Sequence, residues 1–120
     1  VLVGVGGSED SYIAVKNAIH RAKQADDELT FAIFDHPDND VEVATIRDFI
    51  SNTLEEHDCD ATIQEIEDNP ASTLTQMAER GEYDQLTIGG GQKRPTGKLA
   101  VGEIAEFVIL NANITVKLVR

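Results

Sequence analysis

The run VLVGVGGS at residues 1–8 decides the fold. Its first five residues predict an apolar β-strand, which Gly6 and Gly7 end. Ser8 can cap the helix that follows, with Ser11 as an alternative start. Apolar residues then recur at helical spacing, at Val15, Ala18, Ile19 and Ala22. A strand that passes through a glycine turn into a helix is typical of a parallel α/β sheet.

The same alternation continues along the chain. Further strands are predicted at 29–34, 59–67, 85–88 and 114–119, with amphipathic helices between them. The third helix begins at Asn69-Pro70 and ends at Gly81, and a loop from Gly89 to Lys98 leads into the last helix. The third and fifth strands carry charged residues that suit the edges of a sheet. The pattern therefore predicts one α/β domain over residues 1–120, with a mostly parallel five-stranded sheet in the order 3-2-1-4-5 and helices on both faces.

Charge and cysteine content exclude several classes of protein. Ten basic residues against 22 acidic ones give a net charge of −12, which argues against binding to nucleic acid or anionic membranes. The acids are scattered, as on a solvated surface suited to a high-salt cytoplasm, and their repulsion predicts greater stability in salt. A single cysteine, Cys59, rules out an internal disulfide and fits a cytoplasmic location.

The segment from Gly89 to Glu103 gathers glycines and cations where ligands bind such sheets, beyond the carboxyl ends of the strands. Lys93, Arg94, Thr96 and Lys98 are four potential anion contacts in an otherwise acidic chain. Glycines let the backbone approach a ligand, and free N–H groups at a helix start attract phosphate. Two interpretations stay open on these residues alone: a phosphate or nucleotide site, or a flexible turn whose cations offset local repulsion.

Several motifs that occur in a fixed order along the chain bear on the choice between these two interpretations. The strand and turn at 1–8 match an I-L-V-x-V-D-G-S pattern, and Asn69-Pro70-Ala71 matches an x-P-A helix start. Gly89 and Gly102 fit the frame of G-x2-G-x9-G-[ST], followed by an A-E-x-[VI] helix at 105–108 and a V-x-[LV]-V-[RK] end at 116–120. In this set the chain resembles the universal stress protein family over essentially its full length. The resemblance implies a Rossmann-like, adenine nucleotide alpha hydrolase-like fold, ATP as a possible cofactor, and dimers that pair their last strands.

Three departures weaken the nucleotide motif. The second glycine of the motif falls on Gln92, its final Ser/Thr falls on Glu103, and the aspartate that meets the nucleoside falls on Gly6. A carboxylate at a helix start occupies the N–H groups and repels phosphate. The candidate nucleotide- or anion-binding residues are Val5, Gly6, Gly89, Gln92, Lys93, Arg94, Thr96, Lys98, Gly102 and Glu103.

We therefore expect a regulatory or binding module of the stress response with weakened or lost ATP binding. The alternative is an ATP-, nucleotide- or anion-binding switch that uses the 89–103 segment. No catalytic residues are expected, beyond at most slow ATP hydrolysis, and no metal site, because the spacing of His57, Asp58, Cys59 and Asp60 matches no zinc pattern. The expected partner is a second copy, paired through Ile114, Val116 and Leu118.

Overall fold

The computed structural model describes residues 1–36, 41–81, 83–93 and 99–119. Its elements are β1 (Leu2–Val5), α1 (Glu9–Ala25), β2 (Thr30–Phe34), α2 (Val43–Glu56), β3 (Thr62–Ile66), α3 (Pro70–Arg80), β4 (Gln85–Gly89), β5 (Gly91–Lys93), β6 (Leu99–Val101), α4 (Glu103–Asn111) and β7 (Thr115–Val119). Five strands form a parallel sheet in the order β3-β2-β1-β4-β7. This confirms the predicted order 3-2-1-4-5.

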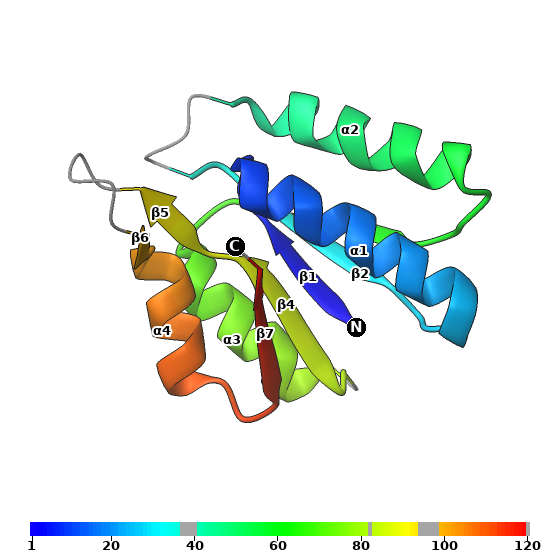
Figure 1. The fold of residues 1–120 in the computed structure, drawn as a ribbon. Coiled ribbons are helices and arrows are strands. Elements are labelled where there is room, and N and C mark those ends of the chain that lie inside the picture. Colours follow the sequence, from blue (N-terminus) through cyan, green and yellow to red (C-terminus); the bar gives the residue numbers. More distant parts are fainter. Residues whose placement is uncertain (37–40, 82, 94–98, 120) are drawn as a thin grey trace.

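Two helices cover each face of the sheet, α1 and α2 on one side and α3 and α4 on the other (Figure 1). Side chains alternate along the central strands to fill both layers. Val3 and Val5 of β1 pack with α1 and α2, whereas Leu2 packs with α3 and α4. All of β1 and β2 is buried, while β3 and β7 are partly exposed, as expected for edge strands. None of the described helices is long and apolar enough to cross a membrane.

The first helix begins where the sequence predicted. Ser8 is the N-cap of α1, and its Oγ accepts a hydrogen bond of 3.1 Å from the backbone N–H of Ser11. The Ser11 hydroxyl in turn donates to the Ser8 carbonyl at 2.7 Å. Both serines therefore stabilise the same helix start, a role worth about 1 kcal/mol for a capping residue.

The third strand is shorter than predicted, because it begins at Thr62 and not at Cys59. Cys59 belongs to the end of α2, where its N–H donates to the Leu54 carbonyl at 2.9 Å. The preceding residue, Asp58, has a φ of 51°, the left-handed conformation that often ends a helix.

The segment after β4 also differs from the predicted loop. Gly91–Lys93 and Leu99–Val101 form a small antiparallel pair, β5 and β6, with Gly91 opposite Val101. The pair projects beyond the carboxyl edge of the main sheet, between the end of β4 and the start of α4 (Figure 1). The chain therefore reaches α4 through a short hairpin.

Candidate functional site

The ends of β1 and β4 and the start of α4 meet at the carboxyl edge of the sheet. Strands β1 and β4 are neighbours, with Gly4 opposite Ile88. The Gly90 N–H donates to the Val119 carbonyl at 3.1 Å, and the Gly102 N–H donates to the Gly90 carbonyl at 2.9 Å. The predicted site residues Val5, Gly6, Gly89 and Gly102 therefore lie around one edge, where parallel sheets bind ligands.

Close packing explains why two residues at this edge, Gly89 and Gly90, are glycines. A Cβ on Gly89 would lie 2.3 Å from the Ser11 nitrogen and 2.6 Å from the Asp10 carbonyl carbon, both of them backbone atoms of the first turn of α1. A Cβ on Gly90 would lie 2.2 Å from Leu118 Cδ1 and 2.8 Å from Ala105 Cβ. Helix α1 crosses Gly89 so closely that no other residue fits there, with or without a ligand.

Gly102 has no such neighbour. The nearest atom to a Cβ at this position is the Gly90 carbonyl oxygen at 3.9 Å, and its φ of −65° and ψ of 156° suit any residue. Gly102 is the N-cap of α4 and provides no side-chain cap. Among Gly6, Gly89, Gly90 and Gly102, Gly102 is the one at which an added Cβ makes only an ordinary van der Waals contact with described atoms.

Two acidic residues lie in the first turn of α4, directly after Gly102. Glu103 is the first residue of α4, and Glu106 lies in the same turn; both are exposed. Their carboxylates suit the positive end of the helix dipole, so they stabilise the helix while lowering its attraction for anions.

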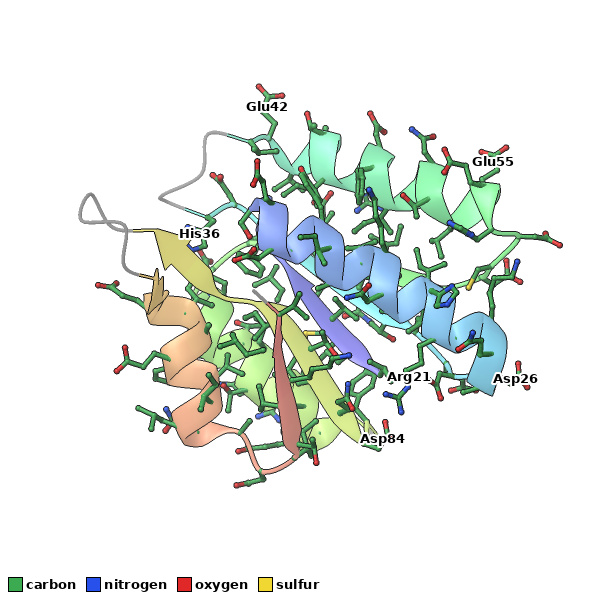
Figure 2. The ribbon with its side chains drawn as sticks, viewed as in Figure 1. Arg21, Asp26, His36, Glu42, Glu55 and Asp84 are labelled. Atoms are coloured by element: carbon green, nitrogen blue, oxygen red, sulfur yellow. The ribbon has the colours of Figure 1, made fainter. Side chains whose placement is uncertain are left out.

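Gly6, which follows β1, lies against an aromatic ring. A Cβ on Gly6 would be 2.7 Å from Cε2 and 3.1 Å from Cζ of Phe34, and 3.3 Å from Cβ of His36. Phe34 is 3% exposed, and its ring centroid lies 6.3 Å from that of half-buried His36. Figure 2 shows His36 at the carboxyl end of the sheet, on the side of the β5–β6 pair in this view.

A pocket of about 370 Å³ opens beside this edge, between the end of β2, the start of α3 and the first two turns of α4. Its walls are largely apolar, although Asp35, Asn69 and Ser72 bring polar groups; the lining residues are Asp35, Asn69, Pro70, Ala71, Ser72, Ile104 and Phe107. A volume of this size is enough for a small organic molecule.

Of the remaining predicted site residues, the structure describes some and not others. Gln92 and Lys93 belong to β5, opposite Ala100 and Leu99 of β6. Arg94, Thr96 and Lys98 lie outside the described residues. Their proposed contacts with an anion therefore stay predictions.

The strand proposed for dimer pairing, β7, is at the edge of the main sheet. The side chains of Ile114, Val116 and Leu118 are partly buried and pack toward α3 and α4. The positions between them, Thr115 and Lys117, lie on the opposite face of the sheet, toward α1, and are exposed. A partner that paired with this edge would meet its backbone, with side chains on both faces of the sheet beside it.

Within the described ranges, no group of three or more His, Cys, Asp or Glu side chains is arranged to hold a metal ion. Cys59 is half-buried, with its thiol 3.8 Å from the Asp60 carbonyl oxygen. Its neighbours in the core include apolar residues of the α1 and α2 layer, which fits a packing role.

Phe34, His36 and Asp35 are the residues of this edge that the sequence pattern did not single out. The observation that identifies Phe34 is the register between β1 and β2, which the structure gives and the sequence pattern does not. Val5 lies opposite Ile33, so the next residues along the two strands, Gly6 and Phe34, lie side by side. A glycine paired with a large aromatic residue indicates that the ring occupies the space of the missing side chain.

Comparison with known proteins agrees with the fold. The profile of the universal stress protein family matches residues 1–120. No curated protein sequence shows a significant match to the chain. The structure is similar to a universal stress protein from Archaeoglobus fulgidus, with 19% identity, a TM-score of 0.78 and coverage of 99% of this chain and 96% of that one. It is also similar to UspA from Lactobacillus plantarum, with 19% identity, a TM-score of 0.81 and coverage of 99% and 95%.

A third similar structure is a universal stress protein solved in complex with cAMP, with 23% identity, a TM-score of 0.72 and coverage of 99% and 95%. Identities this low show a shared fold, and the family profile adds a match in sequence over the whole chain. The chain belongs to the universal stress protein family.

Proposed function

We propose that this domain is a regulatory or binding module of the cytoplasmic stress response whose affinity for ATP is weakened or lost. The observation that carries the proposal is Glu103, an exposed carboxylate on the first residue of α4. The start of α4 is where backbone N–H groups and the helix dipole would otherwise attract phosphate. Two like charges about 4 Å apart at an effective dielectric near 20 repel by about 4 kcal/mol before screening. A typical micromolar affinity is about 8 kcal/mol, so one such contact removes much of it.

Isothermal titration of the protein with magnesium-ATP at high salt tests this proposal. We expect no saturable binding in the micromolar range for the natural sequence. Glu103→Gln should raise the ATP affinity by about tenfold or more, because it removes the repulsive charge while keeping the side chain size. The matched control is Glu106→Gln, which removes an acid from the same turn three residues further from the helix start. Micromolar binding by the natural sequence, or equal gains from both variants, would contradict the proposal.

The alternative is a nucleotide- or anion-binding switch. The similar universal stress protein solved with cAMP, and the pocket of about 370 Å³ beside the carboxyl edge, favour this possibility. It predicts saturable ATP or cAMP binding in the same titration, together with a rise in melting temperature that follows ligand concentration.

We further propose a homodimer that pairs the β7 edges of two copies. An open edge strand offers unpaired backbone groups, which a second copy can satisfy. Light scattering should then give a dimer mass that stays constant from high concentration down to the low micromolar range. A monomer mass at micromolar concentration would count against this mode of assembly.

A further inference from the structure

Strand β3 is an open edge of the main sheet, at the opposite end of the strand order from β7. The Thr62 N–H donates to the Leu29 carbonyl at 3.0 Å, on the side of β2. Main-chain groups of successive residues in a strand point to alternate sides, so Ile63 and Glu65 direct their N–H and C=O groups away from β2. Among the described strands β3 pairs only with β2, so these two residues can pair with an added strand.

A groove of about 370 Å³ lies beside this edge, on the α3 face of the sheet. Gln64 of β3 lines it together with Thr73, Met77 and Arg80 of α3 and with Tyr83. A strand added to β3 would direct every second side chain to this face. Met77 and Tyr83 offer apolar surface to such a side chain, whereas Arg80 would repel a cation there. The groove therefore suits a large apolar residue.

The chain around β3 is acidic. Residues 55–69 contain seven acids and no lysine or arginine, whereas the opposite edge strand, Thr115–Val119, carries a lysine and no acid. Glu67 and Asp68 follow directly after β3, and both are exposed. Within the strand, Arg47 of α2 pairs with Glu65 at 2.8 Å. Two β3 edges would therefore repel each other, and the charge favours a cationic partner.

We propose that β3 binds an extended, lysine- or arginine-rich segment of another protein by strand addition, with one large apolar side chain in the groove beside Met77 and Tyr83. Hydrogen bonds to the main chain of Ile63 and Glu65 hold the segment, and the side chains select it. The acids around the strand favour basic residues, and the groove favours an apolar one. This surface lies apart from the nucleotide motif and from β7, so the proposal goes beyond the proposed function and does not depend on it.

Fluorescence anisotropy at about 0.15 M salt, where weak long-range attraction is screened, tests the proposal with a synthetic peptide. The labelled, end-blocked probe has two lysines at each end and Thr-Phe-Thr at its centre. We expect saturable binding with a Kd of about 100 µM or tighter. A peptide with glycine in place of phenylalanine should bind at least fivefold more weakly, and one with glutamate in place of lysine should not saturate. Failure of the probe to bind, or equal binding by the glycine peptide, would overturn the proposal.

Amide hydrogen exchange locates the peptide on the protein. The Ile63 and Glu65 amides point away from β2, so they should exchange at least tenfold more slowly when the probe is bound. The Gln64 amide already faces β2 and should change little, which makes it the internal control. Probe binding that leaves the exchange of Ile63 and Glu65 unchanged would mean that the peptide adheres to the acidic surface elsewhere, and the proposal would be wrong.

Two substitutions of one residue separate the main chain from the side chain. Glu65→Pro and Glu65→Ala both remove the ion pair with Arg47, but only proline also removes the N–H that faces the open edge. Proline is tolerated at such an edge position, and melting curves show whether each variant is folded. The proline variant should bind the probe at least tenfold more weakly than the alanine variant. Equal binding by the two folded variants would contradict strand addition.

A second copy of this chain is the competing occupant, because its β7 edge carries Lys117. In that case the Ile63 and Glu65 amides would become protected as the protein concentration rises without any peptide, and light scattering would show assemblies larger than a dimer. That result would overturn the proposal of a separate protein partner. If proline at residue 65 prevents folding, the exchange experiment on the natural sequence still decides between these outcomes.

Discussion

The glycines at the carboxyl edge meet different neighbours, although the sequence presents them as one glycine-rich motif. Gly89 touches the backbone of α1 and Gly6 lies against the Phe34 ring, whereas a Cβ on Gly102 would meet only the Gly90 carbonyl oxygen, at 3.9 Å. Both ends of the motif's frame, Gly89 and Gly102, lie at this edge. The motif could not separate the roles of the glycines, since close approach of a helix and close approach of a ligand demand the same residue.

At this scale, the structure predicts that Gly89→Ala costs about 2 kcal/mol or more of unfolding free energy, because the new Cβ meets backbone atoms that cannot rotate away. Gly102→Ser should change stability by less than about 0.5 kcal/mol, and it adds a residue type favoured at helix N-caps. Urea denaturation of both variants measures the difference. Equal unfolding free energies for Gly89→Ala and Gly102→Ser would show that α1 moves aside to make room for the new methyl group at residue 89.

The site residues that the sequence missed share a physical reason. Phe34 is the last residue of an apolar strand, and periodicity alone identifies it as ordinary core. Its effect on Gly6 depends on the register between two strands, which a pattern along one chain does not contain. The departures at Gly6 and Glu103 could be recognised from the sequence without the strand register, because each changes the chemistry of a single position in the motif.

Among the elements, the long amphipathic helices and the buried strands could be predicted because each buries a regular stripe of side chains. The hairpin of β5 and β6 could not, since three residues in each strand are too few to show an alternation. The start of β3 was placed too early because Cys59 and Ala61 alternate with polar residues like a strand. The hydrogen bond from the Cys59 N–H to the Leu54 carbonyl shows that Cys59 belongs to the turn that ends α2.

The contact between α1 and α2 provides a prediction at this scale. The rings of Tyr12 and Phe49 lie 4.4 Å apart at an angle of 41°, and Lys16 Nζ lies 5.9 Å from the centre of the Phe49 ring. Burial raises the pKa of Tyr12 above its ordinary value of 10.0. Above pH 10 the unfolded chain therefore loses this proton before the folded one, and the folded state loses stability as the pH rises toward the folded pKa.

Tyr12→Phe should remove this part of the alkaline loss, so its unfolding free energy should fall less than that of the natural sequence above pH 10. Below pH 10 the two proteins should show parallel pH dependence. Urea denaturation across the range from neutral to alkaline pH measures both slopes. The same alkaline slope in both proteins would mean that ionised Tyr12 is accommodated between the helices.

For the whole molecule, the sheet order was predictable because charged residues mark the edge strands and right-handed crossovers leave few arrangements. Charge also determines how the molecule responds to salt. Ion pairs join Val1 with Asp84, Arg21 with Asp27, and Arg47 with Glu65, and each of these includes an exposed partner. Such pairs are worth at most about 1 kcal/mol each. Figure 2 shows acids such as Glu42 and Glu55 projecting outward from the helices.

Salt should therefore stabilise the fold, because it screens more repulsion than attraction. We expect the unfolding free energy to rise by about 1–3 kcal/mol between 0.05 and 1 M sodium chloride, over which the screening length falls from more than 10 Å to about 3 Å. Denaturation by urea, which is uncharged, measures the rise. The double variant Glu55→Gln and Glu56→Gln should show a smaller rise, since both side chains are exposed and both substitutions reduce the negative charge. A fall in stability with salt would mean that the ion pairs outweigh the repulsion.

The contact between α1 and Gly89 also has a consequence for how such sequences diverge. Selection for folding alone preserves this glycine, because the helix leaves no room for any other residue. Gly102 has no such close neighbour among the described residues, so folding alone does not require glycine there. The inner glycine of the motif therefore reports on folding alone, and only the outer one can report on a ligand.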